Sequence, residues 1–216
     1  MNSIKPKTAL ISLSDKSNLE VLVDFLVSQD VKILSTGGTF KAIQKITKKV
    51  IEVSEFTGFD EMMGGRVKTL HPKIHAGILA RRDSDMEVLQ ERGYEPIDLV
   101  VVNLYPFQET IASECSFEEA IENIDIGGPT MIRAAAKNFK DVTVVSNPND
   151  YNQLIEEWSH EDGITLETRK IFAQKVFETM AEYNNAIAKY MMNDDSSKMP
   201  DYKFDSSIKL RYGENP

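Results

Sequence analysis

Short apolar runs alternate with segments of helical periodicity along most of the chain. The helical segments at residues 18–28 and 39–46 repeat leucine, isoleucine and valine at steps of three and four. The apolar runs have the length and β-branched content of buried strands, and they lie at residues 8–12, 31–34, 50–53, 99–102 and 142–145. Strands separated by helices favour a mostly parallel sheet, so we predict a three-layer α/β fold with helices on both faces of the sheet.

A longer helix is expected near the C-terminal end. Between residues 165 and 193 a single apolar stripe includes Phe172, Val176 and Met180. The stripe lacks the sustained heptads of a coiled coil, so packing across the domain is favoured over pairing with a partner. A polar, turn-rich segment follows at residues 194–200. We therefore predict one domain over residues 1–193, followed by a linker segment over residues 194–216.

Charge and composition exclude some classes of partner. The net charge is −9 at pH 7, whereas nucleic acid demands a broad basic surface, so we expect no nucleic-acid partner. A single phosphate needs only a few local donors and is compatible with this charge. No run of about 18 apolar residues could span a bilayer, and the single Cys115 cannot form an internal disulfide. We expect a cytoplasmic protein with a small-molecule partner and no membrane partner; a homodimer remains open.

Loops rich in glycine, hydroxyl groups and charge follow the expected strands. They read SLSDK at residues 12–16, STGGT at 35–39, GGRVKTLHP at 64–72 and NLYPF at 103–107. The carboxyl ends of parallel strands lie at one edge of a sheet, and ligands of such sheets bind at that edge. The four loops should therefore converge on one site.

The loop at residues 64–72 has the chemistry of an anion site. Its glycines let backbone amides approach an oxyanion, Arg66 can bind it in a bidentate manner, and Lys68 adds a mobile charge. The alternative is a solvated basic turn. A further stretch, NIDIGGPTMIRAAAKN at residues 123–138, places Asp125 before a Gly-Gly-Pro helix start and Lys137 near the end of that helix.

These five stretches together resemble one family in sequence and in order. It is the inosine monophosphate (IMP) cyclohydrolase domain of the bifunctional purine-synthesis enzyme that also carries an aminoimidazole carboxamide ribonucleotide transformylase. The resemblance runs from Ala9 to about Tyr190 and implies a methylglyoxal synthase-like fold with additional C-terminal helices. It implies ring closure of 5-formamidoimidazole-4-carboxamide ribonucleotide to IMP, with loss of water and with no metal or cofactor. Residues 210–216 resemble the opening of the transformylase domain, so we expect a fragment that does not transfer formyl groups.

The resemblance assigns the charge and proton chemistry to Lys68, Lys137, Asp125 and Tyr105. If Gly128 caps the helix, Arg133 and Lys137 share one face, where a neighbouring cation should depress the pKa of Lys137. The plainer alternatives are a helix-end charge for Lys137, a helix-start acid for Asp125 and core packing for Tyr105.

The resemblance also implies a set of substrate-binding residues. The phosphate is expected at a helix N-terminus formed by Thr36, Gly37, Gly38 and Thr39, with Lys16, Ser12, Ser14 and Arg66 nearby. Asn103 is expected to bind the amide or the ribose. The remaining positions carried over from the family's motifs are Asp15, Ser35, Val67, Thr69, Leu104, Ile126 and Gly127.

A metal site and other functions of the same fold are the remaining alternatives. His71 and His75 have helical spacing, but Pro72 should interrupt a helix there and no third ligand is in place, so we expect no metal site. The methylglyoxal synthase-like fold also occurs in nucleotide-sensing modules and in a sugar-phosphate lyase. A nucleotide-sensing module would leave the stretches at residues 64–72 and 125–137 unexplained, and a sugar-phosphate lyase would explain the phosphate site but give no role to Lys137.

Overall fold

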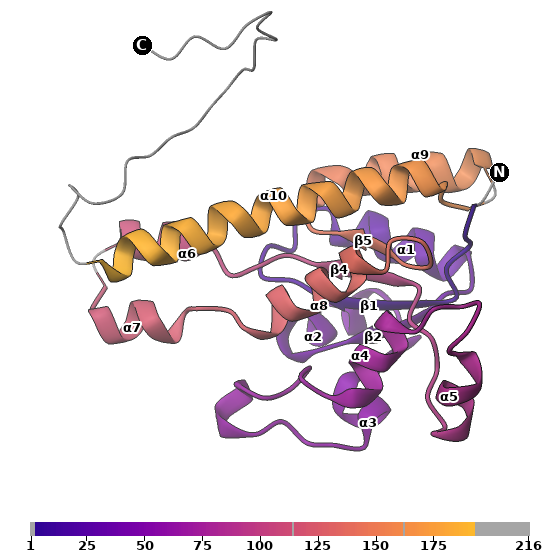
Figure 1. The fold of residues 1–216 in the computed structure, drawn as a ribbon, viewed down its shortest axis with the longest axis horizontal. Coiled ribbons are helices and arrows are strands. Elements are labelled where there is room, and N and C mark those ends of the chain that lie inside the picture. The colour runs from indigo at the N-terminus through magenta and orange to yellow at the C-terminus, as the bar shows by residue number, and fades with distance from the viewer. Residues whose placement is uncertain (1–2, 114, 162, 193–216) are drawn as a thin grey trace, which may run out of the picture.

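The computed structural model of the chain describes residues 3–113, 115–161 and 163–192 (Figure 1). A five-stranded parallel sheet in the order β3-β2-β1-β4-β5 forms its centre. The strands are β1 Thr8–Ser12, β2 Lys32–Ser35, β3 Val50–Glu52, β4 Leu99–Val102 and β5 Thr143–Val145. Ala9 of β1 pairs with Ile33 of β2 on one side and with Leu99 of β4 on the other. The predicted parallel α/β fold is confirmed.

The helices occupy the connections between the strands and the C-terminal part of the described chain. They are α1 Leu19–Ser28, α2 Gly37–Ile46, α3 Val53–Thr57, α4 Pro72–Leu79, α5 Met86–Glu91, α6 Phe107–Ala112, α7 Phe117–Glu122, α8 Gly127–Lys137, α9 Tyr151–Glu161 and α10 Leu166–Met191. Two short 3-10 turns lie at Met63–Gly65 and Pro148–Asp150. Among residues 3–113, 115–161 and 163–192, no helix has the length and hydropathy needed to cross a membrane.

The strand order determines which helices cover which face. The chain runs from β1 through β2 to β3 in one direction along the sheet, and from β4 to β5 in the other. Because crossovers between parallel strands are right-handed, the two directions place their helices on opposite faces. Accordingly α1 contacts α2, whereas α4 contacts α8 (Figure 1). The strand order reverses between β1 and β4, and α/β sheets bind their ligands at the carboxyl ends of the strands beside such a reversal.

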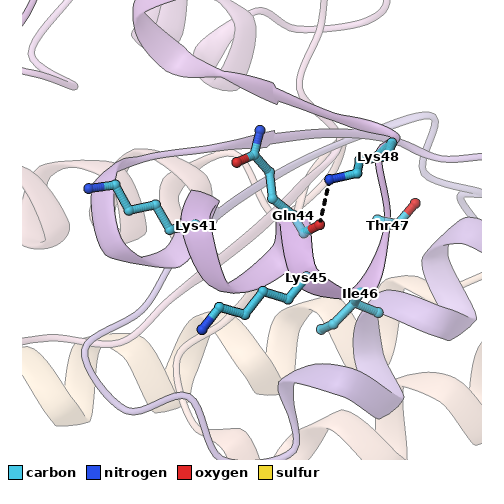
Figure 2. A pocket seen from close by; sticks show the side chains of 6 residues that line it. All are labelled: Lys41, Gln44, Lys45, Ile46, Thr47 and Lys48. Carbon is cyan, nitrogen blue, oxygen red and sulfur yellow. Dashed lines mark hydrogen bonds between the residues drawn. The ribbon is translucent and has the colours of Figure 1, made fainter.

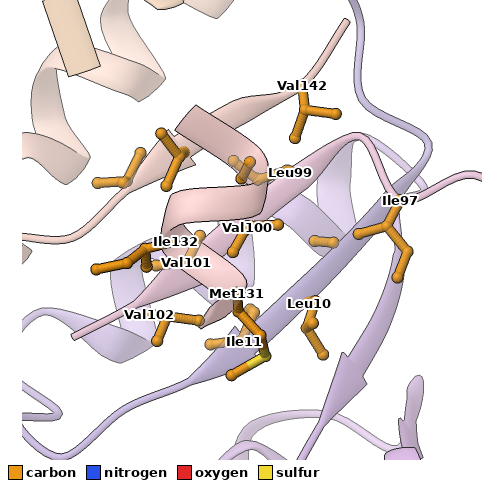
Figure 3. Close-up of a cluster of buried hydrophobic side chains, with 14 of the residues drawn as sticks. Leu10, Ile11, Ile97, Leu99, Val100, Val101, Val102, Met131, Ile132 and Val142 are labelled. Carbon is orange, nitrogen blue, oxygen red and sulfur yellow. The ribbon is translucent and has the colours of Figure 1, made fainter. Parts of the chain in front are cut away.

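The core extends over both faces of the sheet, and one part of it lies between α8 and the central strands. Figure 3 shows Met131 and Ile132 of α8 gathered with Val100 and Val101 of β4 in one apolar cluster. All four side chains are buried, as is Leu10 on the neighbouring strand. Helices cover both faces of this sheet, so every residue of β4 is buried and the strand is apolar throughout.

Helix α10 packs along the domain, as its apolar stripe predicts. Thr165 caps it by accepting a hydrogen bond from the Thr168 amide at 3.3 Å, and the helix contacts α8, β5 and α6. The guanidinium of buried Arg169 donates to the carbonyls of Phe139 and Lys140, both at 2.9 Å. The predicted linker and the stretch at residues 210–216 lie outside the described residues.

Three local expectations were wrong. Val53 begins α3 rather than ending β3. Pro72 does not interrupt a helix but starts α4, because proline is well suited to a first helical position; His71 caps it, its Nδ1 accepting from the Lys73 amide at 3.1 Å. Gly128 is the second residue of α8 and Ile126 is its N-cap, since the helix already begins at Gly127.

Candidate functional site

Predicted site residues from separate loops lie at the carboxyl edge of the sheet. Ser12 ends β1, Thr36 follows β2 and Asn103 follows β4. Since β1 and β4 are neighbours at the point where the strand order reverses, these residues lie in the position where α/β sheets bind ligands.

Hydroxyl groups fasten the loop after β1 to the turn after β2. Ser12 Oγ lies 3.0 Å from Thr36 Oγ1, and Thr39 Oγ1 accepts from the Leu13 amide at 2.8 Å and donates to the Leu13 carbonyl at 3.0 Å. Ser35 is fully buried and donates to the Ile11 carbonyl at 2.8 Å. The side chains of Ser35 and Thr39 are therefore engaged in holding the two loops. What the turn offers a ligand is the N-terminus of α2, where the first N–H groups have no partner within the helix.

Asn103 connects the loop after β4 to the loop after β1. Its Oδ1 accepts from the amides of Ser14 at 2.7 Å and Asp15 at 3.1 Å, and its Nδ2 donates to the Asp15 carbonyl at 2.7 Å. Lys16 is exposed, and its Nζ donates to the Ser14 carbonyl at 3.2 Å. Hydrogen bonds from Ser17 lower the pKa of Asp15. Three of the four hydrogen bonds that an asparagine amide can make are thus spent on loop geometry.

A tight hairpin carries the two predicted loop cations. Met62 and Val67 form an antiparallel bridge, and the turn between them has positive φ at Met63 (53°), Gly64 (64°) and Gly65 (94°). Glycine adopts such angles without strain, which explains the paired glycines of this loop. The hairpin brings Arg66 and Lys68 back toward the sheet.

Each of these cations is paired with a carboxylate. Lys68 Nζ forms an ion pair with Glu61 and lies 3.2 Å from the place that a Cβ on Gly37 would take. Arg66 is bound by Glu122, with 2.8 Å between Nε and Oε1, and this pairing lowers the pKa of Glu122. Lys68 therefore lies at the N-terminal turn of α2, and the hairpin is also fastened to α7.

Asp125 caps the start of α8. Its Oδ1 accepts from the Gly128 amide at 2.9 Å. Burial raises the pKa of Asp125, although the backbone N–H groups of Gly128, Tyr105 and Gly127 lower it. A Cβ on Gly128 would lie 2.4 Å from Asp125 Oδ2 and 2.8 Å from Leu104 Cδ2, so a side chain here would force Asp125 and Leu104 to move. The helix-start role of Asp125 is therefore real, and burial also makes the carboxyl more basic than usual.

The remaining contacts close the arrangement into a ring. Thr69 is buried, and its Oγ1 lies 2.9 Å from the place of a Cβ on Gly127. We use the name site ring for this closed series of contacts, which joins Ser12 to Thr36, Gly37 to Lys68, Thr69 to Gly127, Asp125 to Tyr105, and Asn103 to Ser14. Tyr105 is 57% exposed, which excludes the core-packing alternative for it. All five sequence stretches contribute to the site ring.

The other predicted site residues lie at different distances from the site ring. Val67 forms the hairpin bridge, Gly38 is exposed in the first turn of α2, and Ile126 is exposed beside Asp125. Lys137 does not join them. It is the exposed last residue of α8, ten residues beyond Gly127, which corresponds to about 15 Å along a helix. Arg133, on the same helix, places its guanidinium 5.9 Å from the centre of the Phe177 ring.

A hollow elsewhere does not coincide with the ring. It has a volume of about 560 Å³ and is lined by residues of the last turns of α2 and its end, including Lys41, Lys45 and Lys48 (Figure 2). All its lining residues come from one short segment. Lysines at a helix C-terminus complement the helix dipole and face water, so we assign this hollow no chemistry.

Sequence reasoning missed three residues that support the site. Glu61 and Glu122 pair with the loop cations, and Tyr183 of α10 accepts a hydrogen bond from the Asp125 amide at 2.8 Å. The acids are two among many on an acidic chain, and Tyr183 is indistinguishable from its neighbours in the apolar stripe. None of them carried a local signal.

The histidines hold no metal-like arrangement. Burial lowers the pKa of His75, although a hydrogen bond to the Thr69 backbone raises it. Its Nε2 is buried without a hydrogen-bond partner. Within residues 3–113, 115–161 and 163–192 there is no cluster of three or more His, Cys, Asp or Glu that could hold a metal ion. His75 thus supports the backbone at Thr69.

Comparisons with known proteins agree with this architecture. The model of the MGS-like domain matches residues 18–130, and that of the AICARFT/IMPCHase bienzyme matches residues 135–216. The bifunctional purine biosynthesis protein PurH of Clostridium botulinum (strain Langeland) is 50% identical over 212 residues, which is 97% of this chain and 42% of that protein. PurH of Clostridium acetobutylicum is similar to the same extent. The crystal structure of ForH superimposes with a TM-score of 0.74 and 32% identity, covering 87% of this chain and 100% of that one.

Proposed function

This chain belongs to the family of MGS-like domains, in the branch that matches the AICARFT/IMPCHase bienzymes, and we propose that it acts as an IMP cyclohydrolase. It spans 42% of the length of the PurH proteins that it matches. The proposal therefore concerns one reaction, the closure of 5-formamidoimidazole-4-carboxamide ribonucleotide to IMP with loss of water.

The site ring is the observation that carries this proposal. It brings a helix N-terminus that is suited to a phosphate into one arrangement with Lys68 and with a partly buried carboxyl at the start of α8. A nucleotide with a phosphate at one end and an amide to be deprotonated at the other requires these two features in one crevice. A plain phosphate sensor has no need of the second.

The phosphate is assigned to the first turn of α2. Backbone N–H groups of Gly37 and Gly38 point out of the helix start, and Lys16 and Arg66 supply positive charge. A phosphate dianion competes with Glu122 for Arg66. That exposed ion pair is weak enough to be exchanged.

The ring closure is assigned to the start of α8 and its surroundings. The carboxamide nitrogen attacks the formyl carbon within one molecule, so a new C–N bond forms and the formyl oxygen becomes a hydroxyl. One proton leaves the carboxamide nitrogen and one leaves the formamide nitrogen, and together with the formyl oxygen they depart as water. Asp125 accepts the first proton, and burial favours this by making the carboxyl more basic. Lys68 and the Tyr105 hydroxyl stabilise the oxyanion.

No electron transfer occurs in this reaction, and both reacting groups are tethered. We therefore propose that it needs neither a metal nor a folate. We propose a mononucleotide as the partner, because a few local donors can bind its single phosphate despite the net charge of −9, and we place the reaction in the cytoplasm.

An ultraviolet assay with the formylated ribonucleotide tests the proposal. Purified protein with EDTA and without folate should produce IMP. Folded protein that binds the nucleotide but yields no IMP would instead indicate a nucleotide-sensing module of the same fold.

A further inference from the structure

The hydroxyl of Tyr183 reaches the site from a helix far along the chain. The Asp125 amide donates to Tyr183 Oη at 2.8 Å, across 58 residues of sequence. We propose that Tyr183 is a positioning residue for Asp125, so that α10 fixes the carboxyl of the reaction. This inference rests on the proposed function, because it concerns the residue to which proton transfer is assigned.

Hydrogen bonds hold Asp125 from opposite sides. Its carboxylate is anchored to the Gly128 amide at the start of α8, and its backbone amide is anchored to α10. A residue in a loop that is held at only one of these points could rotate about its own backbone. With both points held, the carboxyl keeps one direction relative to the crevice.

Tyr183 is suited to this role by its burial. It is 9% exposed on the buried face of α10, and its ring packs edge-on against Phe107 at 6.3 Å. Burial raises the pKa of Tyr183, so the phenol stays neutral at the pH where the protein is expected to work. Without the phenol oxygen, the Asp125 amide would lose its partner in a half-buried position, which is costly.

A second tyrosine on the same helix supplies a matched comparison. Tyr190 also packs edge-on against Phe107, at 5.7 Å, and stacks on Phe117 at 5.8 Å. Its hydroxyl makes no hydrogen bond to any part of the chain that the structure describes. Tyr183→Phe and Tyr190→Phe therefore remove the same atom from the same helix, but only the first change touches Asp125.

The experiment compares the two variants with the parent protein in the ring-closure assay. For Tyr183→Phe we expect kcat to fall roughly 3- to 30-fold, the size of one lost hydrogen bond to a half-buried group. KM should stay within about twofold, because the phosphate is bound at α2. Tyr190→Phe should keep both constants within about twofold. A merely structural tyrosine would lower the melting temperature without this separation of kcat from KM.

Parent-like kcat in Tyr183→Phe, or an equal loss in Tyr190→Phe, would overturn the inference. A second measurement is independent of catalysis: hydrogen exchange of the Asp125 amide, followed by NMR, should be faster in Tyr183→Phe than in the parent and unchanged in Tyr190→Phe. If Tyr183→Phe does not fold, hydrogen exchange in the parent protein still tests the inference. An Asp125 amide that exchanges without protection in the parent would refute the hydrogen bond to Tyr183. An inactive parent with a protected amide would sink the proposed function while leaving this contact in place.

Discussion

Gly128→Ala offers the sharpest test of the geometry at the start of α8. The new Cβ would lie 2.4 Å from Asp125 Oδ2, whereas ordinary contact begins at 3.4 Å, so the carboxylate must retreat by about 1 Å. The hydrogen bond from the Gly128 amide to Oδ1, now 2.9 Å long, would then exceed bonding distance.

The expected magnitude follows from two opposing contributions. Losing a hydrogen bond to a charged group costs about 1.5–3 kcal/mol, and replacing glycine by alanine in a helix returns up to about 1 kcal/mol. The net loss of unfolding free energy is about 0.5–3 kcal/mol, which lowers the melting temperature by about 1–12 °C in a chain of this size. A carboxyl displaced by 1 Å should also reduce kcat by roughly 10- to 100-fold.

Gly38→Ala is the matched control for stability. Gly38 is the second residue of α2, as Gly128 is of α8, but a Cβ there meets no atom within 4 Å. It should raise the unfolding free energy by roughly 0.5–1 kcal/mol in scanning calorimetry. The reasoning fails if Gly128→Ala melts as high as the parent and retains its kcat, or if both variants lose equal stability.

Further outcomes can be measured on the same protein. Lys68→Ala should lower kcat by roughly 10²- to 10⁴-fold. The family resemblance predicts proton chemistry for Lys137 as well, but Lys137→Ala should lower kcat less than about 10-fold, because this lysine lies at the far end of α8. Equal losses of kcat in the two variants would show that the far end of α8 takes part in the chemistry. Lys16→Ala should raise KM more than it lowers kcat, since phosphate contacts are alike in ground state and transition state; the opposite pattern in steady-state kinetics would contradict this. Asp125→Asn should abolish turnover yet stabilise the fold at neutral pH, because burial raises the pKa of this carboxyl and its ionisation then costs stability. In urea titrations the gain in unfolding free energy should fade below about pH 4, where Asp125 of the parent is protonated in both the folded and the unfolded state. A gain that does not depend on pH would refute this cause. Arg169→Met should lower the unfolding free energy by about 2–6 kcal/mol, because two buried carbonyls lose their donor at roughly 1–3 kcal/mol each, and a urea midpoint close to the parent's would exclude this.

The sheet was predictable because each strand has a recognisable local pattern of apolar residues. The run at residues 99–102 is apolar without interruption, which fits a strand covered on both faces, and the structure buries all of it. The stripe of α10 likewise fixed its buried face. Ends were less predictable: Val53 suits a strand by its side chain, yet it starts α3, because a strand's end depends on neighbours that a local pattern does not contain.

The site residues also fall into those that the sequence could predict and those that depend on the packing of distant elements. Loops after parallel strands must meet at one edge, so Ser12, Thr36 and Asn103 were placed correctly from topology alone. The distance of Lys137 from Asp125 was implicit in the predicted helix, since ten helical residues separate the lysine from Gly127. Tyr183 was beyond reach, because its hydrogen bond depends on how α10 lies across the domain.

Because the contacts of the site ring form a closed series, the site should tolerate single substitutions better than paired ones. In an open chain of contacts, any broken link frees everything beyond it, whereas in a ring each segment is still held from its other side. Loss of the Ser12–Thr36 contact leaves the loop after β1 fastened through Asn103, and the reverse is equally true. Single substitutions at these links would thus be buffered, and pairs of them would cost more than the sum of their separate effects. Such redundancy lets individual loop residues drift through neutral variation, while joint changes on both sides of one loop are penalised.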